Sequence, residues 1–305
     1  MLPARRRSLT PGRRARARGR SLVELMIALT IGLLISLFLT GLYLLGQTNS
    51  RSLDASQQIE DVARFVQLSI ARQLREAGYS PVLADGRARM YGWNDLALNA
   101  PLYGCSGTFN TAIDVAGGLG APGCATTTTP SESIEIRALT VPYNAATGEG
   151  EDCLGNAAPA VGRGPFPLQH IVVNRYYLAT GSSGRSELFC RANGGTDAQS
   201  LAVGVEQLVF WYGSNGLADA KQSVSRWDRA GTVPDWTLVT AVRFCFVMTS
   251  PEGAAVTATS GSNATSYTDC LGATQNSSAD GRLRRAYWTT VTLRNVVNGT
   301  STPLI

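Results

Sequence analysis

The chain has 305 residues, of which 44% are hydrophobic and 16% are charged, and its formal net charge is +5. This composition excludes a disordered chain, which would be rich in charge and poor in large apolar residues. It also excludes a membrane protein with many spans, because the chain contains one long apolar run. Residues 1–19 carry seven arginines and no acid, so subtracting their +7 leaves −2 for residues 20–305. We therefore expect no nucleic-acid binding by the body of the chain.

The first predicted element is a membrane-spanning helix. Residues 25–46 contain no charged residue, and at about 1.5 Å per residue they would reach roughly 33 Å, enough to cross a bilayer core. Because the arginines precede this run, the positive-inside rule places the amino terminus in the cytoplasm and the rest of the chain on the other side. The run is longer than the apolar region of a cleaved secretory signal, whereas a plain signal anchor fits its hydropathy.

One acid stands at the start of this apolar run. Glu24 would cost a few kcal/mol inside a bilayer unless it found a partner. The string over residues 18–26, Arg-Gly-Arg-Ser-Leu-Val-Glu-Leu-Met, resembles the class III signal of type IV prepilins. The resemblance implies cleavage by a prepilin peptidase between Gly19 and Arg20, which leaves the glutamate at the fifth mature position. Arg20 stands where this family usually has Phe. The resemblance further implies an ion pair between Glu24 and the new amine of Arg20 on a neighbouring subunit.

A second helical pattern follows directly. Apolar residues recur every three or four positions from Leu53 to Ala77, which is typical of an amphipathic helix. Gly78 then ends the pattern. We predict one helix over residues 25–77, with a helix broken near residues 46–50 as the alternative. The expected organisation is a basic leader (1–19), a transmembrane helix (20–46), its amphipathic continuation (47–78) and a β-rich globular domain (79–305).

The remainder of the chain favours antiparallel strands. Alternation predicts a short strand near residues 134–141 and longer strands over 171–178, 188–190, 201–212, 236–248 and 286–297. Residues 80–130, 143–165 and 250–282 read as long loops or small insertions, and we find no internal repeat. The predicted fold class is α+β, pilin-like, with the long helix packed on a C-terminal antiparallel sheet.

Six cysteines lie on the predicted non-cytoplasmic side, where an even number favours disulfides. Fifteen pairings are possible, and we favour nearest neighbours because each bond would then close a loop-rich stretch. A metal site is disfavoured by the lack of a Cys-x-x-Cys motif and by a single histidine. The candidates are Cys105, Cys124, Cys153, Cys190, Cys245 and Cys270.

Other residues that could carry chemistry do not assemble into a catalytic motif. His170 has no nucleophile motif beside it, so we interpret it as structural. The acids Glu149, Glu151 and Asp152 fit a solvated loop better than a calcium site. Trp211 with Tyr212, and Trp288, fit a sheet core or edge better than a binding face. We expect no enzyme, no cofactor and no metal.

Three further segments resemble PilW-type minor pilins, over residues 74–79, 203–213 and 289–295. The resemblance implies a minor pilin that primes type IV pilus assembly at the inner membrane, with its C-terminal domain in the periplasm, and then sits at or near the pilus tip. The implied partners are the prepilin peptidase, other minor pilins, the major pilin and, as a further candidate, a tip adhesin. The alternatives are a type II secretion pseudopilin of the GspJ type and a signal-anchored periplasmic adhesin or enzyme.

Overall fold

The computed structural model describes residues 19, 21–80, 100–115, 119–126, 131–147, 149–163, 166–195, 197–214, 223–250, 266–276 and 282–296, without the side chains of residues 48, 49, 51, 52 and 162–169. The chain forms two compact units, residues 1–50 and 51–305. The domain boundaries expected from the sequence stay predictions.

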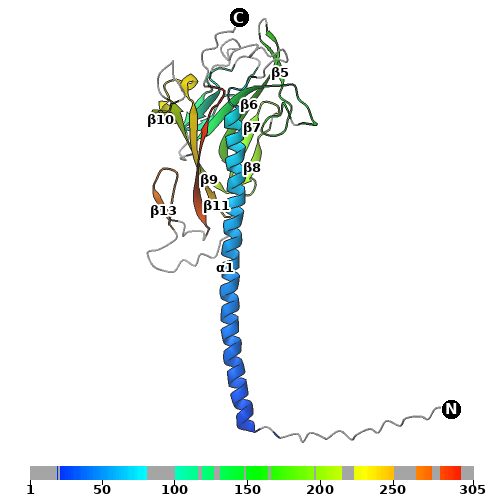
Figure 1. The fold of residues 1–305 in the computed structure, drawn as a ribbon, viewed down its shortest axis with the longest axis vertical. Helices are drawn as coiled ribbons and strands as arrows, with labels where there is room; N and C mark the ends of the chain where they lie inside the picture. The colour runs from blue at the N-terminus through cyan, green and yellow to red at the C-terminus, as the bar shows by residue number, and fades with distance from the viewer. Residues whose placement is uncertain are drawn as a thin grey trace, which may run out of the picture. The chain divides into compact units, whose positions relative to one another are not determined.

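A single helix, α1, runs from Leu22 to Glu76 (Figure 1). The sequence predicted a helix over residues 25–77, and the alternative of two helices parted near residue 46 is wrong. The helix ends because Gly78 adopts a φ of 73°, a left-handed conformation that favours glycine. The backbone N–H of Gly78 then donates to the carbonyl oxygen of Arg137 at 3.0 Å, so the end of the helix is tied to a strand.

The larger sheet of the second unit is antiparallel and has six strands. Its order is β1-β4-β6-β7-β8, and β5 also pairs with β6. In β4 the apolar side chains of Ile134 and Ile136 lie in the main core, as the two-residue period of a strand requires. The bounds are β1 Leu102–Cys105, β4 Ser133–Thr140, β5 Ala160–Arg163, β6 Phe166–Thr180, β7 Ser186–Ala192 and β8 Gln199–Val203.

The second sheet is also antiparallel and has four strands, in the order β10-β9-β11-β14. Phe244 of the central strand β11 lies opposite Phe210 of β9 and Thr289 of β14. The bounds are β9 Val205–Ser214, β10 Arg226–Asp228, β11 Ala241–Thr249 and β14 Arg284–Thr292. Two small hairpins pair β2 (Gly107–Phe109) with β3 (Cys124–Thr126), and β12 (Ser266–Thr268) with β13 (Thr274–Asn276).

The predicted single strand over residues 201–212 is wrong. β8 ends at Val203 in the six-stranded sheet, and β9 begins at Val205 in the four-stranded sheet. Between them Gly204 has a φ of 89°, and a Cβ there would stand 2.8 Å from the carbonyl oxygen of Thr249. The chain therefore changes sheets at a glycine that a side chain could not replace without strain.

Two other boundaries differ from the expectation. The strand predicted to begin at Trp236 begins at Ala241, because residues 236–238 form a 3-10 turn whose Thr237 N–H is bound by the Asp235 carboxylate at 2.8 Å. The stretches predicted as loops also contain short strands where the structure describes them, namely β1, β2, β3, β5, β12 and β13. Runs of three or four residues are too short for alternation to mark.

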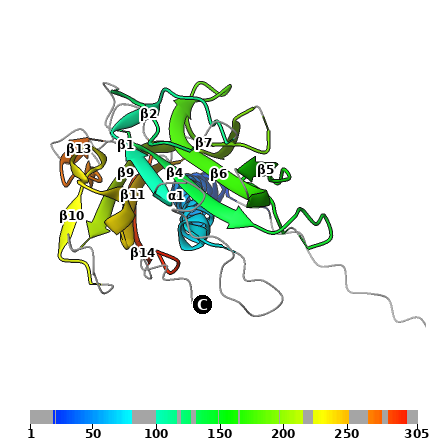
Figure 2. The same cartoon turned by 90° about the horizontal axis from the view of Figure 1, so that it is seen from above.

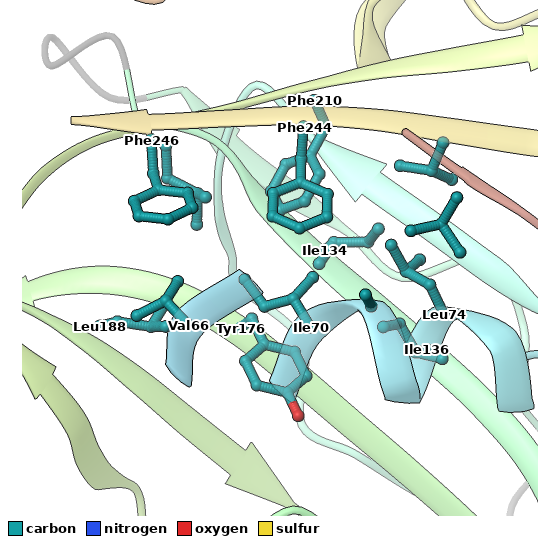
Figure 3. Close-up of a cluster of buried hydrophobic side chains, with 14 of the residues drawn as sticks. Val66, Ile70, Leu74, Ile134, Ile136, Tyr176, Leu188, Phe210, Phe244 and Phe246 are labelled. Atoms are coloured by element: carbon teal, nitrogen blue, oxygen red, sulfur yellow. The ribbon is translucent and has the colours of Figure 1, made fainter. Parts of the chain in front are cut away.

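The core of the second unit lies on both sides of α1. The carboxyl-terminal part of the helix passes between the two sheets (Figure 2). Figure 3 shows Val66, Ile70 and Leu74 of the helix packed among side chains of both sheets. Phe210, Phe244 and Phe246 come from the four-stranded sheet, and Ile134, Tyr176 and Leu188 from the six-stranded sheet. The helix is therefore packed against two sheets, whereas the sequence predicted one. Its fully buried side chains include Ala63, Val66, Ile70 and Leu74.

Candidate functional site

The predicted processing signal lies at the beginning of α1. Gly19 precedes the helix and is exposed, and no atom lies within 4 Å of the position that its Cβ would take. Glu24 is exposed in the first helical turn, where the helix dipole favours a carboxylate. Arg20 lies outside the described residues. Cleavage between Gly19 and Arg20, and the ion pair between Glu24 and Arg20, therefore stay predictions.

The apolar part of α1 is a candidate membrane anchor. Residues Leu22–Gln47 form a span of 26 residues with a mean hydropathy of 2.5. No residue in the most hydrophobic part of this span is buried within the chain. Its hydroxyl groups are bound by the helix itself: Ser36 donates to the carbonyl oxygen of Gly32 at 2.9 Å, and Thr40 donates to that of Ser36 at 2.8 Å. In lipid, polar groups need such internal partners, so the span suits a bilayer by composition and by hydrogen bonding.

The part of α1 in the second unit also exposes apolar side chains. Phe65 is 49% exposed and Leu68 is 61% exposed, on the side of the helix opposite to the buried Ile70. Beside them a cavity of about 350 Å³ lies between the helix and residues 151–153. These two side chains form an exposed apolar surface that the predicted amphipathic pattern did not indicate.

All six cysteines are paired in the structure, which contains no free thiol. The bonds join Cys105 to Cys124, Cys153 to Cys190 and Cys245 to Cys270, the nearest-neighbour pairing. Because each closes a stretch of 19 to 37 residues, each limits the freedom of the unfolded chain.

Two of these bonds belong to a recurring turn that sequence reasoning missed. Asp-Cys-Leu-Gly occurs at residues 152–155 and again at residues 269–272. In each turn the Asp carboxylate accepts hydrogen bonds from the backbone N–H groups two and four residues later, at 2.8–3.0 Å. The glycines have φ values of 78° and 83°. Comparing the flanks of the cysteines would have found this signal.

The remaining disulfide, between Cys105 and Cys124, closes a loop that a buried ionic cluster also attaches to the sheet. Glu135 of β4 is fully buried and accepts from Nε of Arg137 at 2.7 Å and from Nε of Arg175 at 2.6 Å. The two guanidinium groups also donate to the carbonyl oxygens of residues 119, 120 and 111. The cluster therefore ties residues 111, 119 and 120 to the six-stranded sheet, and each buried charge is hydrogen-bonded.

The candidate catalytic and metal-ligating residues have structural contacts. Nδ1 of His170 lies 3.0 Å from the carbonyl oxygen of Ala158, and the Asp152 carboxylate binds its own turn. Glu149 accepts from the hydroxyl of Thr147 at 3.0 Å. Within the described residues, no three His, Cys, Asp or Glu side chains are grouped as metal ligands would be.

The aromatic residues that the sequence grouped together are separated by the sheet. Tyr212 is fully buried against the core, and burial raises the pKa of its hydroxyl well above the usual value. Trp211 points to the opposite side of β9, where its ring stacks on that of Trp288 with centroids 5.1 Å apart. Trp288 lies on the edge strand β14 and is 49% exposed. The expectation of a sheet core or edge thus fits Tyr212 in the core and Trp288 on the edge strand, and the two tryptophans lie on the outer side of the sheet.

Comparison with known proteins matches part of the chain to the family that the motifs suggested. Residues 175–295 match the family model of the type IV pilus-assembly protein W, PilW. The predicted PilW resemblance is confirmed over these residues. Among solved structures, a type IV-like pilin from Thermus thermophilus is similar to the chain with a TM-score of 0.39 and 13% identity, over 78% of this chain and 96% of that one. No curated protein sequence matches the chain.

The PilW match supports a pilin-like component of the type IV pilus. Such a protein is structural rather than enzymatic and interacts with other components of the pilus. The α+β fold class predicted from the sequence, a long amino-terminal helix with antiparallel sheets, is confirmed by the structure. The apolar segment of α1 fits an anchor in a membrane.

Proposed function

We propose that the chain is a minor pilin that primes type IV pilus assembly and then sits at or near the pilus tip. The observation that carries this proposal is the combination of a prepilin-like signal at residues 18–26 with the PilW match over residues 175–295. The match favours a pilus over a secretion pseudopilus, because the matched family is one of pilus assembly.

Before assembly, the apolar span of α1 would hold the protein in the inner membrane. The arginines of residues 1–19 would remain in the cytoplasm, and the second unit would fold in the periplasm. An oxidising compartment agrees with three disulfides. The prepilin peptidase would then remove the leader after Gly19.

The ion pair of Glu24 supplies the contact that starts a filament. Cleavage frees the amine of Arg20, and in apolar surroundings this amine on one subunit would attract the Glu24 carboxylate of the next. Because the amine of one subunit would meet the carboxylate of the next, the contact would be heterologous and would build an open chain of subunits. The exposed Phe65 and Leu68 offer neighbouring subunits a further apolar contact.

The processing step is tested by the mass of the mature protein. We expect the wild-type chain to begin at Arg20 and a Gly19→Val variant to remain at full length, because a branched side chain would obstruct the bond entering the peptidase. A matched control is Gly12→Val, which lies in the leader away from the cut. A Gly19→Val variant shortened to the normal mass would contradict the cleavage site, and a mature chain that begins elsewhere would contradict the pilin proposal.

The assembly role is tested by Glu24→Ala. Cleavage and insertion should persist, since the variant places no charge in the bilayer, whereas recovery of partner pilins and the number of surface filaments should fall. Breaking a buried ion pair costs roughly 3–5 kcal/mol, so even half of that would weaken a step about tenfold or more. The control is Asp54→Ala, an exposed acid on the same helix beyond the apolar span. Unchanged filament number in Glu24→Ala would refute the contact, and gold labelling along filament shafts would refute the tip position.

A further inference from the structure

The outer side of the four-stranded sheet carries a row of aromatic and cationic side chains. Because side chains alternate across a strand, Trp211 and Arg243 face away from α1, opposite to Tyr212 and Phe244. Trp288 of β14 and Trp227 of β10 lie on the same outer side, on either flank. We call Trp211, Trp227, Trp288 and Arg243 the tryptophan platform.

The platform is ordered by contacts among its own members. Arg243 places its guanidinium carbon 4.5 Å from the centre of the Trp227 ring, and its Nε donates to the hydroxyl of Thr290 at 3.3 Å. Trp227 can lie across β9 because the residue beneath it is Gly213, where a Cβ would stand 3.0 Å from the ring. The side chains are thus held in place before any ligand arrives, which lowers the entropy lost on binding.

One ring face of the platform remains open. Trp211 is covered by the guanidinium of Arg229, whose carbon lies 5.1 Å from the ring centre, and by the stacked ring of Trp288. Trp288 is itself 49% exposed. Arg243 lies opposite Thr290, two residues along β14 from Trp288, so the two are diagonal neighbours with Cα atoms about 7–8 Å apart. A ligand lying on Trp288 would reach the guanidinium.

Arg243 differs from neighbouring arginines of this sheet in its ion pairing. No carboxylate lies within ion-pair distance of Arg243 among the residues that the structure describes. Four other arginines in or beside these strands form ion pairs: Arg226 with Asp228, Arg229 with Glu132, Arg284 with Glu206 and Arg285 with Glu60. Within the described residues, the platform therefore offers the cation of Arg243 beside the exposed ring of Trp288.

We propose that the tryptophan platform binds an acidic sugar within an oligosaccharide. The negative face of an indole ring attracts the positively polarised C–H groups of a sugar ring, and a guanidinium matches a carboxylate with two parallel hydrogen bonds. A nucleic acid fits less well, because its closely spaced phosphates require several free cations along the strand. A uronic acid, with one carboxylate on each apolar ring, matches the charge and the surface together. This inference is independent of the filament role proposed above.

The experiment measures binding of a mannuronic acid hexamer to the detergent-solubilised full chain, by calorimetry and by tryptophan fluorescence. Cellohexaose, the neutral comparison, should bind at least about tenfold more weakly. Arg243→Gln should lose about tenfold in affinity for the acidic hexamer and little for cellohexaose, whereas Trp288→Ala should lose affinity for both. Raising the salt concentration tenfold should weaken binding by less than about tenfold, since one cation is neutralised.

Matched controls are Arg72→Gln and Tyr143→Ala, which remove an exposed cation and an exposed ring elsewhere on the second unit. Both should bind as the wild type does. If Trp288→Ala lowers the urea midpoint, Trp288→Phe should keep the fold and give an intermediate affinity. No binding of the acidic hexamer at millimolar concentration would overturn the proposal, as would unchanged binding by Arg243→Gln. Equal or tighter binding of a thymidine hexanucleotide would identify the platform as a nucleic-acid surface instead.

Discussion

The two Asp-Cys-Leu-Gly turns of this protein share their local structure but not their surroundings. Each cysteine is bonded to a strand, and its backbone N–H donates to a side-chain amide on the neighbouring strand: Cys153 to Asn174 at 3.0 Å, and Cys270 to Gln207 at 2.8 Å. In both cases the amide residue lies two positions before the one that faces the bonded strand cysteine. The same four residues therefore build the same attachment twice.

The surroundings of the two turns differ. The first lies on the helix-facing side of the six-stranded sheet, where Leu154 packs against the main core. The second lies on the outer side of the four-stranded sheet, where Leu271 is 50% exposed. Asn174 also donates to the side-chain oxygen of Gln73 in α1 at 2.7 Å. Among the described residues, Gln207 makes no corresponding contact with another element. Local sequence thus determines the turn, and neighbouring elements determine what it buries.

The largest effect is expected on removing either disulfide. The chain-entropy relation gives about 3.8 kcal/mol for the bond with a separation of 37 residues and about 3.5 kcal/mol for that with 25. Replacing Cys153 and Cys190 by Ala, or Cys245 and Cys270, should therefore lower the free energy of unfolding by nearly equal amounts. Urea unfolding of a fragment with residues 51–305 measures both. A difference above about 1.5 kcal/mol would show that surroundings, and not loop closure, decide the value of the bond.

The next largest effect on the free energy of unfolding distinguishes the side-chain amides of Asn174 and Gln207. Losing the partner of a buried N–H costs about 1–3 kcal/mol, and Asn174→Ala should cost more than Gln207→Ala because it also removes the bond to Gln73. Gln73→Ala is the matched control, since it keeps the acceptor for Cys153 and removes only the bond between Asn174 and the helix. It should fall between the wild type and Asn174→Ala. Equal losses in Asn174→Ala and Gln207→Ala would mean that the link to the helix adds no stability.

Much of this fold could be predicted from residue patterns, and the exceptions have physical causes. The helix over residues 25–77 was found because a long apolar run and a period of 3.6 both persist there. The change of sheet at Gly204 was missed because alternation is the same on either side of it. For Trp288 the sequence left a sheet core and a sheet edge open, since a tryptophan fits a buried or an exposed side of a strand equally well by type.

The candidate functional residues could be predicted only where they are consecutive in the sequence. The processing signal can be read directly, because a peptidase recognises consecutive residues such as Gly19 and Arg20. Arg243 and Trp288 lie 45 positions apart in the sequence and meet only through the register of β11 with β14. No pattern within either strand indicates that Arg243 has no carboxylate partner among the described residues, because that depends on ion pairs with other elements.

A smaller effect distinguishes the two leucines. Replacing Leu154 by Ser should destabilise the second unit by about 1–2 kcal/mol, because a partly buried leucine loses its apolar contacts. Leu271→Ser should change the free energy of unfolding by less than about 0.5 kcal/mol, as is usual for an exposed side chain. The two variants change the same residue in the same turn, so each controls for the other. If both were neutral, Leu154 would not contribute to the core, and the contrast between the turns would be lost.

The smallest expected effect is a change in stability at acidic pH. Burial raises the pKa of the Asp269 carboxyl, but hydrogen bonds from Gln275 and from the backbone of its own turn outweigh burial and hold that pKa below its usual 3.8. An acid whose pKa is lower in the folded state stabilises the fold above its unfolded pKa, and that stabilisation is lost as the pH falls through the folded value. Asp269 should therefore contribute fully at pH 6 and progressively less below about pH 4. Asp269→Asn should lower the urea midpoint at pH 6 and have less effect at pH 2.5. A variant as destabilising at pH 2.5 as at pH 6 would show that the geometry of the turn, and not the charge of its aspartate, supplies the stability.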